Sequence, residues 1–261
     1  MARMTRAEAR QPLPRIWFFA ALAALGVAVV PAGLLLRSSG REPAAPAPQP
    51  SAQRGPAPLP TCAYEDERAA HRSYDDWDRT LLDTTFRLGR RYEPPDLVPT
   101  KRAGLGTDET SVREFVIEDL RALAEAAEAA GNPVDITWGY RSFQTQEWVF
   151  DYWREKKGDA AFRTAARPGH SEHQLGTALD FKSKGAANVD VGWRYEPAGV
   201  WMREHAWEFG FLESYPIGKE ALTCYAHEPW HYRYFGRQRA SEIRASGLTV
   251  REFLWREAQG S

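Results

Sequence analysis

The stretch RPGHSEHQLGTALDF, residues 167–181, holds two histidines, two glycines and an aspartate within fifteen positions. His173 and Asp180 lie seven residues apart, with Gly176 between them. An imidazole nitrogen and a carboxylate oxygen are good zinc donors, and a glycine turn lets two such groups meet although they lie on different local elements. Residues 177–183 (TALDFKS) alternate in the manner of a strand. The stretch therefore predicts a turn that leads into a strand and carries part of a metal site.

A second segment, HEPWHYRY at residues 227–234, supplies further donors. Two protein ligands cannot hold zinc alone, but His173, Asp180 and His231 make a three-ligand set. Such a set leaves one coordination position for water, as catalytic zinc requires. Glu228 is then a nearby carboxylate that can take the proton from this water. The two segments together predict a catalytic metal site.

A closed structural metal site is the alternative at the same place. Here His170 or His227 would act as the fourth ligand, and the metal would catalyse nothing. The remaining histidines, His71 and His205, receive no assignment, because a lone histidine is more often a solvent-exposed or hydrogen-bonded side chain than a ligand.

The spacing of Glu228 and His231 sets a condition on the backbone. In a regular strand, residues three apart point to opposite faces of the sheet. We therefore expect the chain to turn at Glu228-Pro229, so that the strand proper begins at Trp230 and both side chains reach one site.

The rest of the domain mixes helices and strands without a regular βαβ alternation, which favours an α+β fold with a central antiparallel sheet flanked by helices. In the first expected helix, residues 111–130, Ser111 and Glu114 form a capping box and Gly131 ends the helix. Gly210 ends the third expected helix, residues 197–211. In the second, four aromatic residues are expected to be partly buried: Phe143, Trp148, Phe150 and Tyr152. Helices are expected at residues 111–130, 141–158, 197–211 and 248–259, and strands at 134–140, 177–183 and 229–236.

The N-terminus predicts a membrane anchor. Residues 16–36 form a run of 21 residues without a charge, enough to span roughly 30 Å of bilayer core as a helix. Residues 1–15 carry four arginines against a single glutamate, so the positive-inside rule keeps this basic segment cytoplasmic and places the rest of the chain outside. A cleaved signal peptide and a buried core helix are the alternatives. We expect a single-pass protein of the cell membrane.

A linker and one folded domain follow the anchor. Residues 37–60 contain seven prolines among alanines and polar residues, a composition typical of an extended spacer. The folded domain is expected at residues 61–261. It contains both cysteines, Cys62 and Cys224, which outside the cytoplasm can form a disulfide; two unpaired buried thiols are the alternative. A formal net charge of −1 gives no sign of nucleic-acid binding.

Two motifs in this order resemble a known family. They are Ser171-x-His173-x-x-Gly176-x-Ala178-x-Asp180 and Glu228-Pro229-Trp230-His231. The chain resembles the D-alanyl-D-alanine carboxypeptidases of the VanY type, within the zinc peptidase group that includes D-Ala-D-Ala dipeptidases and the hedgehog-like fold. The similarity extends from about Tyr92 to Gly236, which is essentially the whole folded domain.

The resemblance implies a role for each motif residue. His173, Asp180 and His231 would be ligands of Zn²⁺ and Glu228 the general base, in agreement with the spacing. Arg141 and Gln146, in GYRSFQTQ, match the family's substrate-side residues: a guanidinium can grip a terminal carboxylate or a developing oxyanion, and an amide can hydrogen-bond a peptide. Ser171 would face the substrate and Trp230 would wall the cleft. The plainer alternatives are a surface charge for Arg141, a helix cap for Ser171 and core packing for Trp230.

The activity implied by the resemblance is zinc-dependent hydrolysis that releases the C-terminal D-alanine from peptidoglycan stem peptides. An L,D-carboxypeptidase or an endopeptidase of the same group would cut a neighbouring bond, and the D,D preference rests on the resemblance alone. A non-catalytic wall-binding module with structural zinc is the alternative from another class. Such a binder has no use for a spare base at the position of Glu228.

Overall fold

The structure of the protein, a computed structural model, describes residues 57–260. The predicted basic segment 1–15, the predicted anchor 16–36 and most of the predicted linker lie outside these residues. Within residues 57–260, none of the helices combines the length and the apolar character that a membrane crossing needs. The first element, strand β1 (Glu67–Arg68), begins soon after the expected domain boundary at residue 61.

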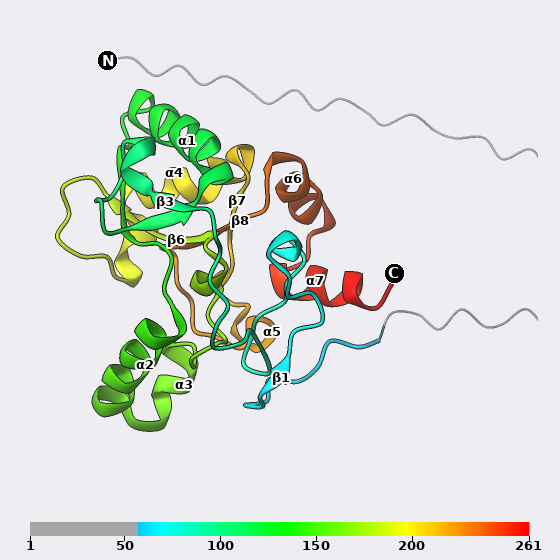
Figure 1. Cartoon of the computed structure of the whole chain (residues 1–261). Coiled ribbons are helices and arrows are strands. Elements are labelled where there is room, and N and C mark those ends of the chain that lie inside the picture. Colours follow the sequence, from blue (N-terminus) through cyan, green and yellow to red (C-terminus); the bar gives the residue numbers. More distant parts are fainter. Residues whose placement is uncertain (1–56, 261) are drawn as a thin grey trace, which may run out of the picture. The chain divides into compact units, whose positions relative to one another are not determined.

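A four-stranded antiparallel sheet forms the centre of the domain, in the order β5 (Val134–Trp138), β6 (Ala178–Ser183), β8 (His231–Tyr234) and β7 (Phe211–Glu213). Figure 1 shows helices α1 (Ile117–Ala129) and α4 (Pro197–His205) above this sheet, and α2 (Phe143–Lys157) and α3 (Ala161–Thr164) below it. The predicted α+β class is confirmed.

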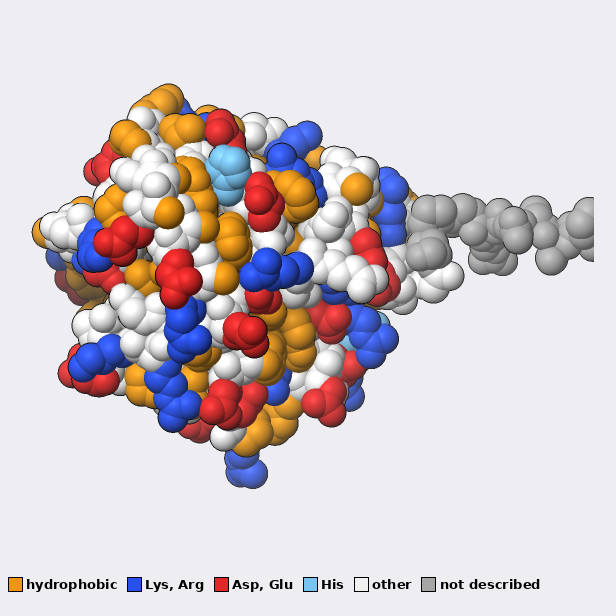
Figure 2. All heavy atoms as spheres, turned by 90° about the horizontal axis from the view of Figure 1, so that it is seen from above, with side chains coloured by type: hydrophobic (Ala, Val, Ile, Leu, Met, Phe, Trp, Pro, Cys, Tyr) orange, Lys and Arg blue, Asp and Glu red, His pale blue; other side chains and the backbone are white. Residues whose placement is uncertain are grey.

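The remaining elements surround this sheet. Two short ladders precede it in the chain: β1 pairs in parallel with β2 (Phe86–Arg87), and β3 (Leu97–Pro99) pairs antiparallel with β4 (Ser111–Arg113). The other helices are α5 (Glu220–Thr223), α6 (Arg237–Ser246) and α7 (Val250–Ala258). On the face drawn in Figure 2, acidic and basic side chains are interspersed.

The hydrophobic core lies on one face of the sheet. Leu179 and Phe181 of β6 and Tyr232 and Tyr234 of β8 are buried in one cluster with apolar residues of α1 and α4. Because side chains alternate along a strand, the residues between them point to the other face. That other face therefore receives the polar residues of β6 and β8, including Asp180 and His231.

The predicted start of the first helix is wrong. Ser111 does not cap a helix but opens strand β4, where Val112 pairs with Val98 of β3 and is fully buried. The carbonyl of Ser111 accepts a hydrogen bond from the backbone N–H of Tyr140, which ties β4 to the end of β5. A short 3₁₀ turn then leads into α1 at Ile117. Tertiary strand pairing has overridden a local capping signal.

Two of the four aromatic side chains assigned to partial burial on the second helix are exposed. Ser142 caps α2 through its side chain and Gly158 follows its last residue, so the helix lies where it was predicted. Trp148 and Tyr152, however, are 64% and 45% exposed, with stacked rings 6.2 Å apart. Both side chains line the wall of a cavity, where no core covers them.

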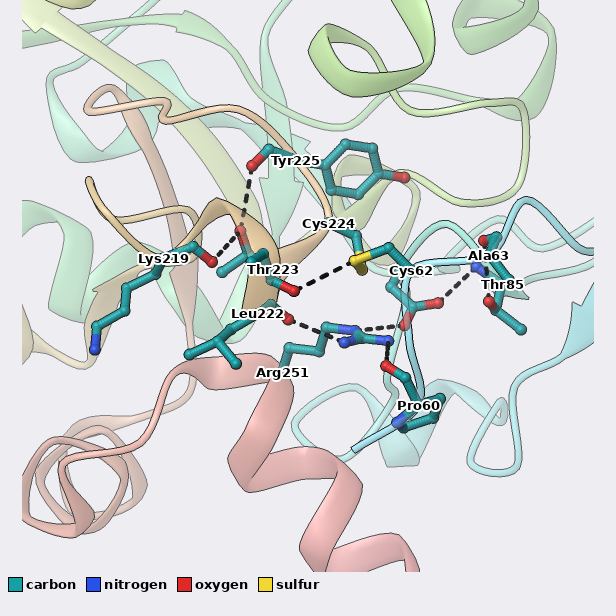
Figure 3. Close-up of a disulfide and its surroundings, with 12 residues drawn as sticks. Pro60, Cys62, Ala63, Thr85, Lys219, Leu222, Thr223, Cys224, Tyr225 and Arg251 are labelled. Carbon is teal, nitrogen blue, oxygen red and sulfur yellow. Dashed lines mark hydrogen bonds and ion pairs between the residues drawn. A yellow bond between two sulfur atoms is a disulfide. The ribbon is translucent and has the colours of Figure 1, made fainter. Parts of the chain in front are cut away.

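The predicted disulfide is present. Cys62 and Cys224 are bonded with a Cα–Cα distance of 5.4 Å, across 162 positions of sequence. Figure 3 shows how the bond joins the start of the domain to the end of α5, immediately before the segment that carries Glu228. The alternative of two unpaired thiols is wrong.

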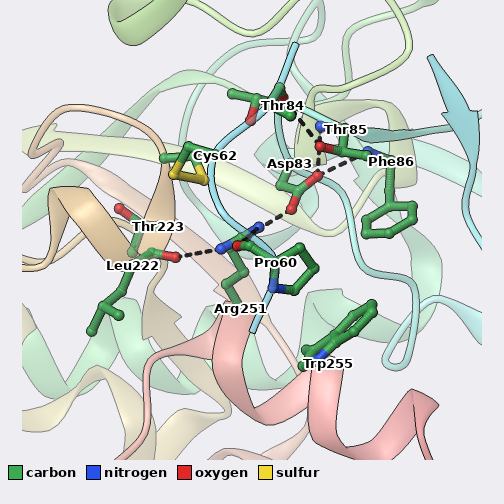
Figure 4. A network of polar contacts seen from close by, with 12 residues as sticks. Pro60, Cys62, Asp83, Thr84, Thr85, Phe86, Leu222, Thr223, Arg251 and Trp255 are labelled. Atoms are coloured by element: carbon green, nitrogen blue, oxygen red, sulfur yellow. Dashed lines mark hydrogen bonds and ion pairs between the residues drawn. A yellow bond between two sulfur atoms is a disulfide. The ribbon is translucent and has the colours of Figure 1, made fainter. Parts of the chain in front are cut away.

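A buried arginine reinforces this junction. Arg251 of α7 donates to the Asp83 carboxylate at 2.6 Å, to the Leu222 carbonyl at 2.9 Å and to the Pro60 carbonyl at 3.1 Å. The second oxygen of Asp83 accepts from the backbone N–H groups of Thr85 and Phe86, so both ends of the ion pair are satisfied (Figure 4). The segment before β1 (residues 57–66, the N-terminal arm), α5 and α7 are thus held at one point.

Removing the disulfide should destabilise the domain. In the double variant Cys62→Ala/Cys224→Ala, the unfolded chain regains the freedom that a closed loop of this length denies it, so the free energy of unfolding should fall by about 2–5 kcal/mol. Urea denaturation of the parent and the variant measures the difference. Reducing agent should destabilise the parent and leave the double variant unchanged; equal midpoints for the oxidised parent and the variant would contradict the prediction.

Candidate active site

The three predicted metal ligands come together on the polar face of the sheet. Asp180 of β6 and His231 of β8 are directly opposite in the antiparallel ladder, and His173 lies on the 3₁₀ turn Glu172–Leu175 that precedes β6. The Asp180 Oδ1 atom is 3.2 Å from His173 Nε2 and 3.1 Å from His231 Nδ1. All three side chains are buried, and their ligand atoms lie within 4.8 Å of one another.

Gly176 makes this convergence possible. It ends the 3₁₀ turn in the left-handed conformation, with φ +73°. A Cβ atom there would lie 2.9 Å from the Arg113 side chain and 3.0 Å from that of Leu97. A glycine is therefore required both for the backbone angle and for the space.

Hydrogen bonds set the direction of each imidazole lone pair. The Nδ1 atom of His173 is 2.7 Å from the carbonyl of Gly139, an acceptor, so Nδ1 carries the proton and the Nε2 lone pair faces Asp180. The Nε2 atom of His231 is 2.9 Å from the Glu172 carboxylate, which leaves Nδ1 directed at Asp180. Each ring thus donates one N–H to an oxygen and presents the other nitrogen to a common point, the arrangement typical of metal-ligating histidines.

The electrostatics of the cluster fit a divalent cation. Burial, together with the charge of Arg141, lowers the pKa of His173 to about 4, so this ring is neutral and its buried Nε2 has no hydrogen-bond donor to pair with. Burial opposes protonation of His231, but its bonds to Asp180 and Glu172 outweigh that and raise its pKa to about 10. Without a metal, His231 is therefore protonated on both nitrogens, and a metal ion bound at Nδ1 would displace the proton from that nitrogen. Two nitrogen donors and one carboxylate oxygen form a set that zinc accepts.

Neither histidine suggested for a closed structural site is available as a fourth ligand. The ring nitrogens of His170 lie 2.7 Å from the carbonyl of Asp83 and 2.9 Å from the carboxylate of Asp66. His227 pairs with Glu213 at 3.1 Å. Within residues 57–260, His173, Asp180 and His231 form the one group of three or more such side chains that could hold a metal. The closed site with His170 or His227 is therefore wrong.

Glu228 lines the same cavity as the cluster. The N–H of His231 donates to the Glu228 carbonyl at 3.1 Å, which closes a turn over Pro229 and Trp230. The expected turn is present, although the strand begins at His231, one residue later than predicted. Burial raises the pKa of Glu228 to about 7, and the negative charge of Asp180 adds to the effect. A carboxyl group with this pKa is suited to general-base chemistry near neutral pH.

Arg141 points into the cavity rather than to the surface. Its side chain is 13% exposed, its Nη1 atom lies 3.6 Å from Asp180 Oδ2 and its guanidinium lies 5.5 Å from the centre of the Trp138 ring. The buried Nε–H of Arg141 has no acceptor within the described residues. The guanidinium therefore has donor capacity left for a bound anion.

The other three predicted site residues also line the cavity. Gln146 is 1% exposed; its amide N–H donates to the Ala166 carbonyl at 2.7 Å, while its oxygen has no partner within residues 57–260. The Ser171 hydroxyl accepts the N–H of His173 at 3.4 Å, so it caps the 3₁₀ turn as well as lining the cavity. Trp230 both packs against the core and lines the cavity.

The cavity has a volume of about 440 Å³. Beside the cluster, its wall includes the exposed aromatic side chains Trp148 and Tyr152 of α2. This volume is in the range of pockets that hold small molecules or short peptide ends. The cavity therefore offers a metal-binding cluster, a carboxylate of raised pKa and a guanidinium to one ligand.

Two participants were missed by sequence reasoning. The carbonyl of Gly139 and the carboxylate of Glu172 orient the two histidine rings. A backbone carbonyl leaves no trace in a sequence. Glu172 does offer one signal, because it is a charged residue between two motif positions, Ser171 and His173.

An α+β domain with a buried His-Asp-His cluster and a neighbouring glutamate in one cavity defines a domain of the zinc-peptidase class. The family model described as VanY, D-alanyl-D-alanine carboxypeptidase, matches residues 109–237. This chain belongs to the VanY family.

Relatives and solved structures agree with this assignment. YodJ of Bacillus subtilis is 33% identical over 179 residues, which cover 67% of this chain and 66% of YodJ. A D-alanyl-D-alanine carboxypeptidase of Enterococcus faecalis is 33% identical over 145 residues, 52% of each protein. The chain thus matches between about half and two thirds of the length of these relatives.

Among solved structures, the LD-carboxypeptidase LdcB has a TM-score of 0.62 at 28% identity, with 74% of this chain and 98% of LdcB covered. A VanY D,D-pentapeptidase variant in complex with Zn(II) has a TM-score of 0.58 at 29% identity, with 68% and 99% covered.

Glu228 should destabilise the protein when no metal ion is bound, a state that a chelator ensures. Because the folded-state pKa of Glu228 is raised to about 7, folding binds a proton near pH 6, and stability is lost as the pH rises from about 4.5 to 7. Glu228→Gln removes this loss. At pH 8, we expect the free energy of unfolding of the variant to be about 1–2 kcal/mol higher than that of the metal-free parent, a figure that allows for the partial exposure of the Glu228 side chain. At pH 5 the difference should be clearly smaller.

Urea unfolding at the two pH values measures this difference. The exposed Glu109→Gln variant is the control and should match the parent at both. A stability gain in Glu228→Gln that is the same at pH 5 and pH 8 would show that burial does not raise this pKa.

Proposed function

We propose that this chain is a zinc-dependent D-alanyl-D-alanine carboxypeptidase that removes the terminal D-alanine from peptidoglycan stem peptides. The observation that carries the proposal is the convergence of His173, Asp180 and His231 with Glu228 in one cavity. The family membership and the Zn(II) complex of a VanY structure support the metal and the reaction class.

Each of these residues has a distinct role in the proposed reaction. Zinc held by His173, Asp180 and His231 would supply Lewis-acid activation of water and of the scissile carbonyl. Glu228, with a pKa near 7, accepts the proton of the attacking water and returns it to the leaving amine. Arg141, with its free N–H donor, pairs with the terminal carboxylate of the peptide or with the developing oxyanion.

The substrate contacts follow from the cavity wall. The oxygen of Gln146 can accept a hydrogen bond from a peptide N–H, because it has no partner within residues 57–260, while one N–H of the amide holds the side chain to Ala166. Ser171 and Trp230 lie on the same wall. The exposed rings of Trp148 and Tyr152 offer apolar surface to the part of the stem peptide that leads away from the cleaved bond.

An L,D-carboxypeptidase is the second candidate. The structural similarity to LdcB, whose whole length is nearly covered by this chain, favours it. The two activities cut neighbouring bonds, which differ in the configuration of the residue that precedes the bond. A D,D-enzyme converts a pentapeptide to a tetrapeptide, and an L,D-enzyme converts a tetrapeptide to a tripeptide.

We also propose that the domain works outside the cytoplasm, attached to the membrane through residues 16–36. The basic residues before that segment support this orientation. The Cys62–Cys224 disulfide supports an oxidising compartment. The proline-rich residues 37–60 would then hold the domain at the level of the cell wall.

Product analysis with defined stem peptides tests the substrate. We expect the purified zinc-loaded protein to release D-alanine from the pentapeptide and to leave tetrapeptide and tripeptide intact, as measured by mass spectrometry. Treatment with a chelator should abolish the release, and added zinc should restore it. Cleavage of the tetrapeptide in preference to the pentapeptide would favour the L,D-activity instead.

Glu228→Gln tests the base. Without a proton acceptor, kcat should fall by about 10²–10⁴ while bound zinc, measured by atomic absorption, stays at the parent level. Glu213→Gln is the matched control, because Glu213 also has a pKa raised to about 7 by burial but pairs with His227 and does not line the cavity. A Glu228→Gln variant that hydrolyses the substrate at the parent rate would remove Glu228 from the mechanism.

A further inference from the structure

The carboxylate of Glu172 is a junction of three buried partners. Its Oε2 atom lies 2.9 Å from His231 Nε2 and accepts the hydroxyl of Ser214 at 2.6 Å. Its Oε1 atom accepts Nη1 of Arg233 at 2.9 Å. Glu172 is 3% exposed and Arg233 is fully buried. The carboxylate is therefore satisfied on both oxygens in a place closed to water.

Arg233 is itself fixed at its other end. Its Nη2 atom donates to the carbonyls of Trp77 and Thr80, at 2.6 Å and 2.8 Å, in the segment before β2. Arg233 lies two residues after His231 on β8, so both side chains point to the same face of the sheet. The residue that holds Glu172 is thus built on the same rigid strand as the ligand that Glu172 touches.

The contact between Glu172 and His231 determines which ring nitrogen of His231 would bind a metal ion. Acceptance of the Nε2–H by Glu172 keeps the proton on that nitrogen and prevents rotation of the ring, so Nδ1 faces Asp180. Carboxylates that hold a ligand histidine in this way also increase its basicity. We propose that Glu172, held by Arg233 and Ser214, is a positioning residue that orients His231 for zinc and sets the affinity of the site. The proposal rests on the zinc site of the proposed function.

A second buried ion pair shows what a purely structural role would look like. Asp83 and Arg251 are 2% and 5% exposed and lie 2.6 Å apart, and they join the N-terminal arm to α5 and α7 (Figure 4). This pair has no contact with His173, Asp180 or His231. It therefore provides a matched control for the loss of a buried carboxylate that pairs with an arginine.

The test is zinc affinity in the full-length protein, measured by titration against a competing chelator. In Glu172→Gln, one side of the new amide is an N–H donor that must face either the Arg233 guanidinium or the His231 N–H, and both of these groups are donors. We expect the dissociation constant for zinc to rise about 10–100-fold, with kcat at limiting zinc reduced and restored by excess zinc, and KM unchanged. Asp83→Asn should lower the melting temperature and leave the zinc dissociation constant at the parent value.

Parent-like zinc affinity in folded Glu172→Gln overturns the proposal, as does an equal loss of affinity in Asp83→Asn. If Glu172→Gln does not fold, the variant Ser214→Ala tests the proposal instead, because it removes only the one hydrogen bond that the Ser214 hydroxyl donates to Glu172. We expect a several-fold weaker zinc affinity in Ser214→Ala, and an unchanged affinity would overturn the proposal. Because zinc binding is measured without substrate, this outcome is separate from any failure of the proposed hydrolysis.

Discussion

The pairing of Asp180 with His231 across strands β6 and β8 is the constraint on which the site depends. Directly opposite residues of an antiparallel ladder bring their side chains close together on one face. The same register puts Leu179 and Tyr232 into the core on the other face. A slip of one residue would exchange the two faces and bury the ligands among the apolar side chains. The hydrophobic core therefore enforces the register that brings Asp180 and His231 together.

The sequence predicts the parts of the site whose chemistry is local. His173, Asp180 and His231 are recognisable because donor residues lie beside a glycine turn and a predicted strand, and the chain brings all three together. The α+β class, the positions of three of the four central strands and the disulfide were also predictable. Local periodicity and cysteine count carry that information.

The parts that could not be predicted depend on partners far away in the chain. Ser111 and Glu114 look like a capping box, but Val112 pairs with Val98, and that contact decides in favour of a strand. Glu172 has the appearance of an ordinary charged residue until Arg233, 61 positions later, and Ser214 are placed around it. The exposure of Trp148 likewise depends on a cavity that no helical period reveals.

The proposed ligands and the proposed base are supported in different ways, and the chemistry proposed for them explains the difference. A metal centre needs fixed donor positions, and two of its three donors lie on neighbouring strands of the sheet. Glu228 lies instead on the segment between α5 and β8, where, in the proposed reaction, it would approach water and the leaving amine in turn. The disulfide at Cys224 holds one end of this segment and β8 holds the other, while the N–H of Glu228 donates to the Tyr215 carbonyl at 3.2 Å. Cys224 has a φ of +70°, the one positive value among the non-glycine residues 57–260, so the bonded cysteine maintains a backbone conformation that is otherwise unfavourable. The N-terminal arm thus contributes to the candidate active site indirectly, because it restrains the segment that carries Glu228.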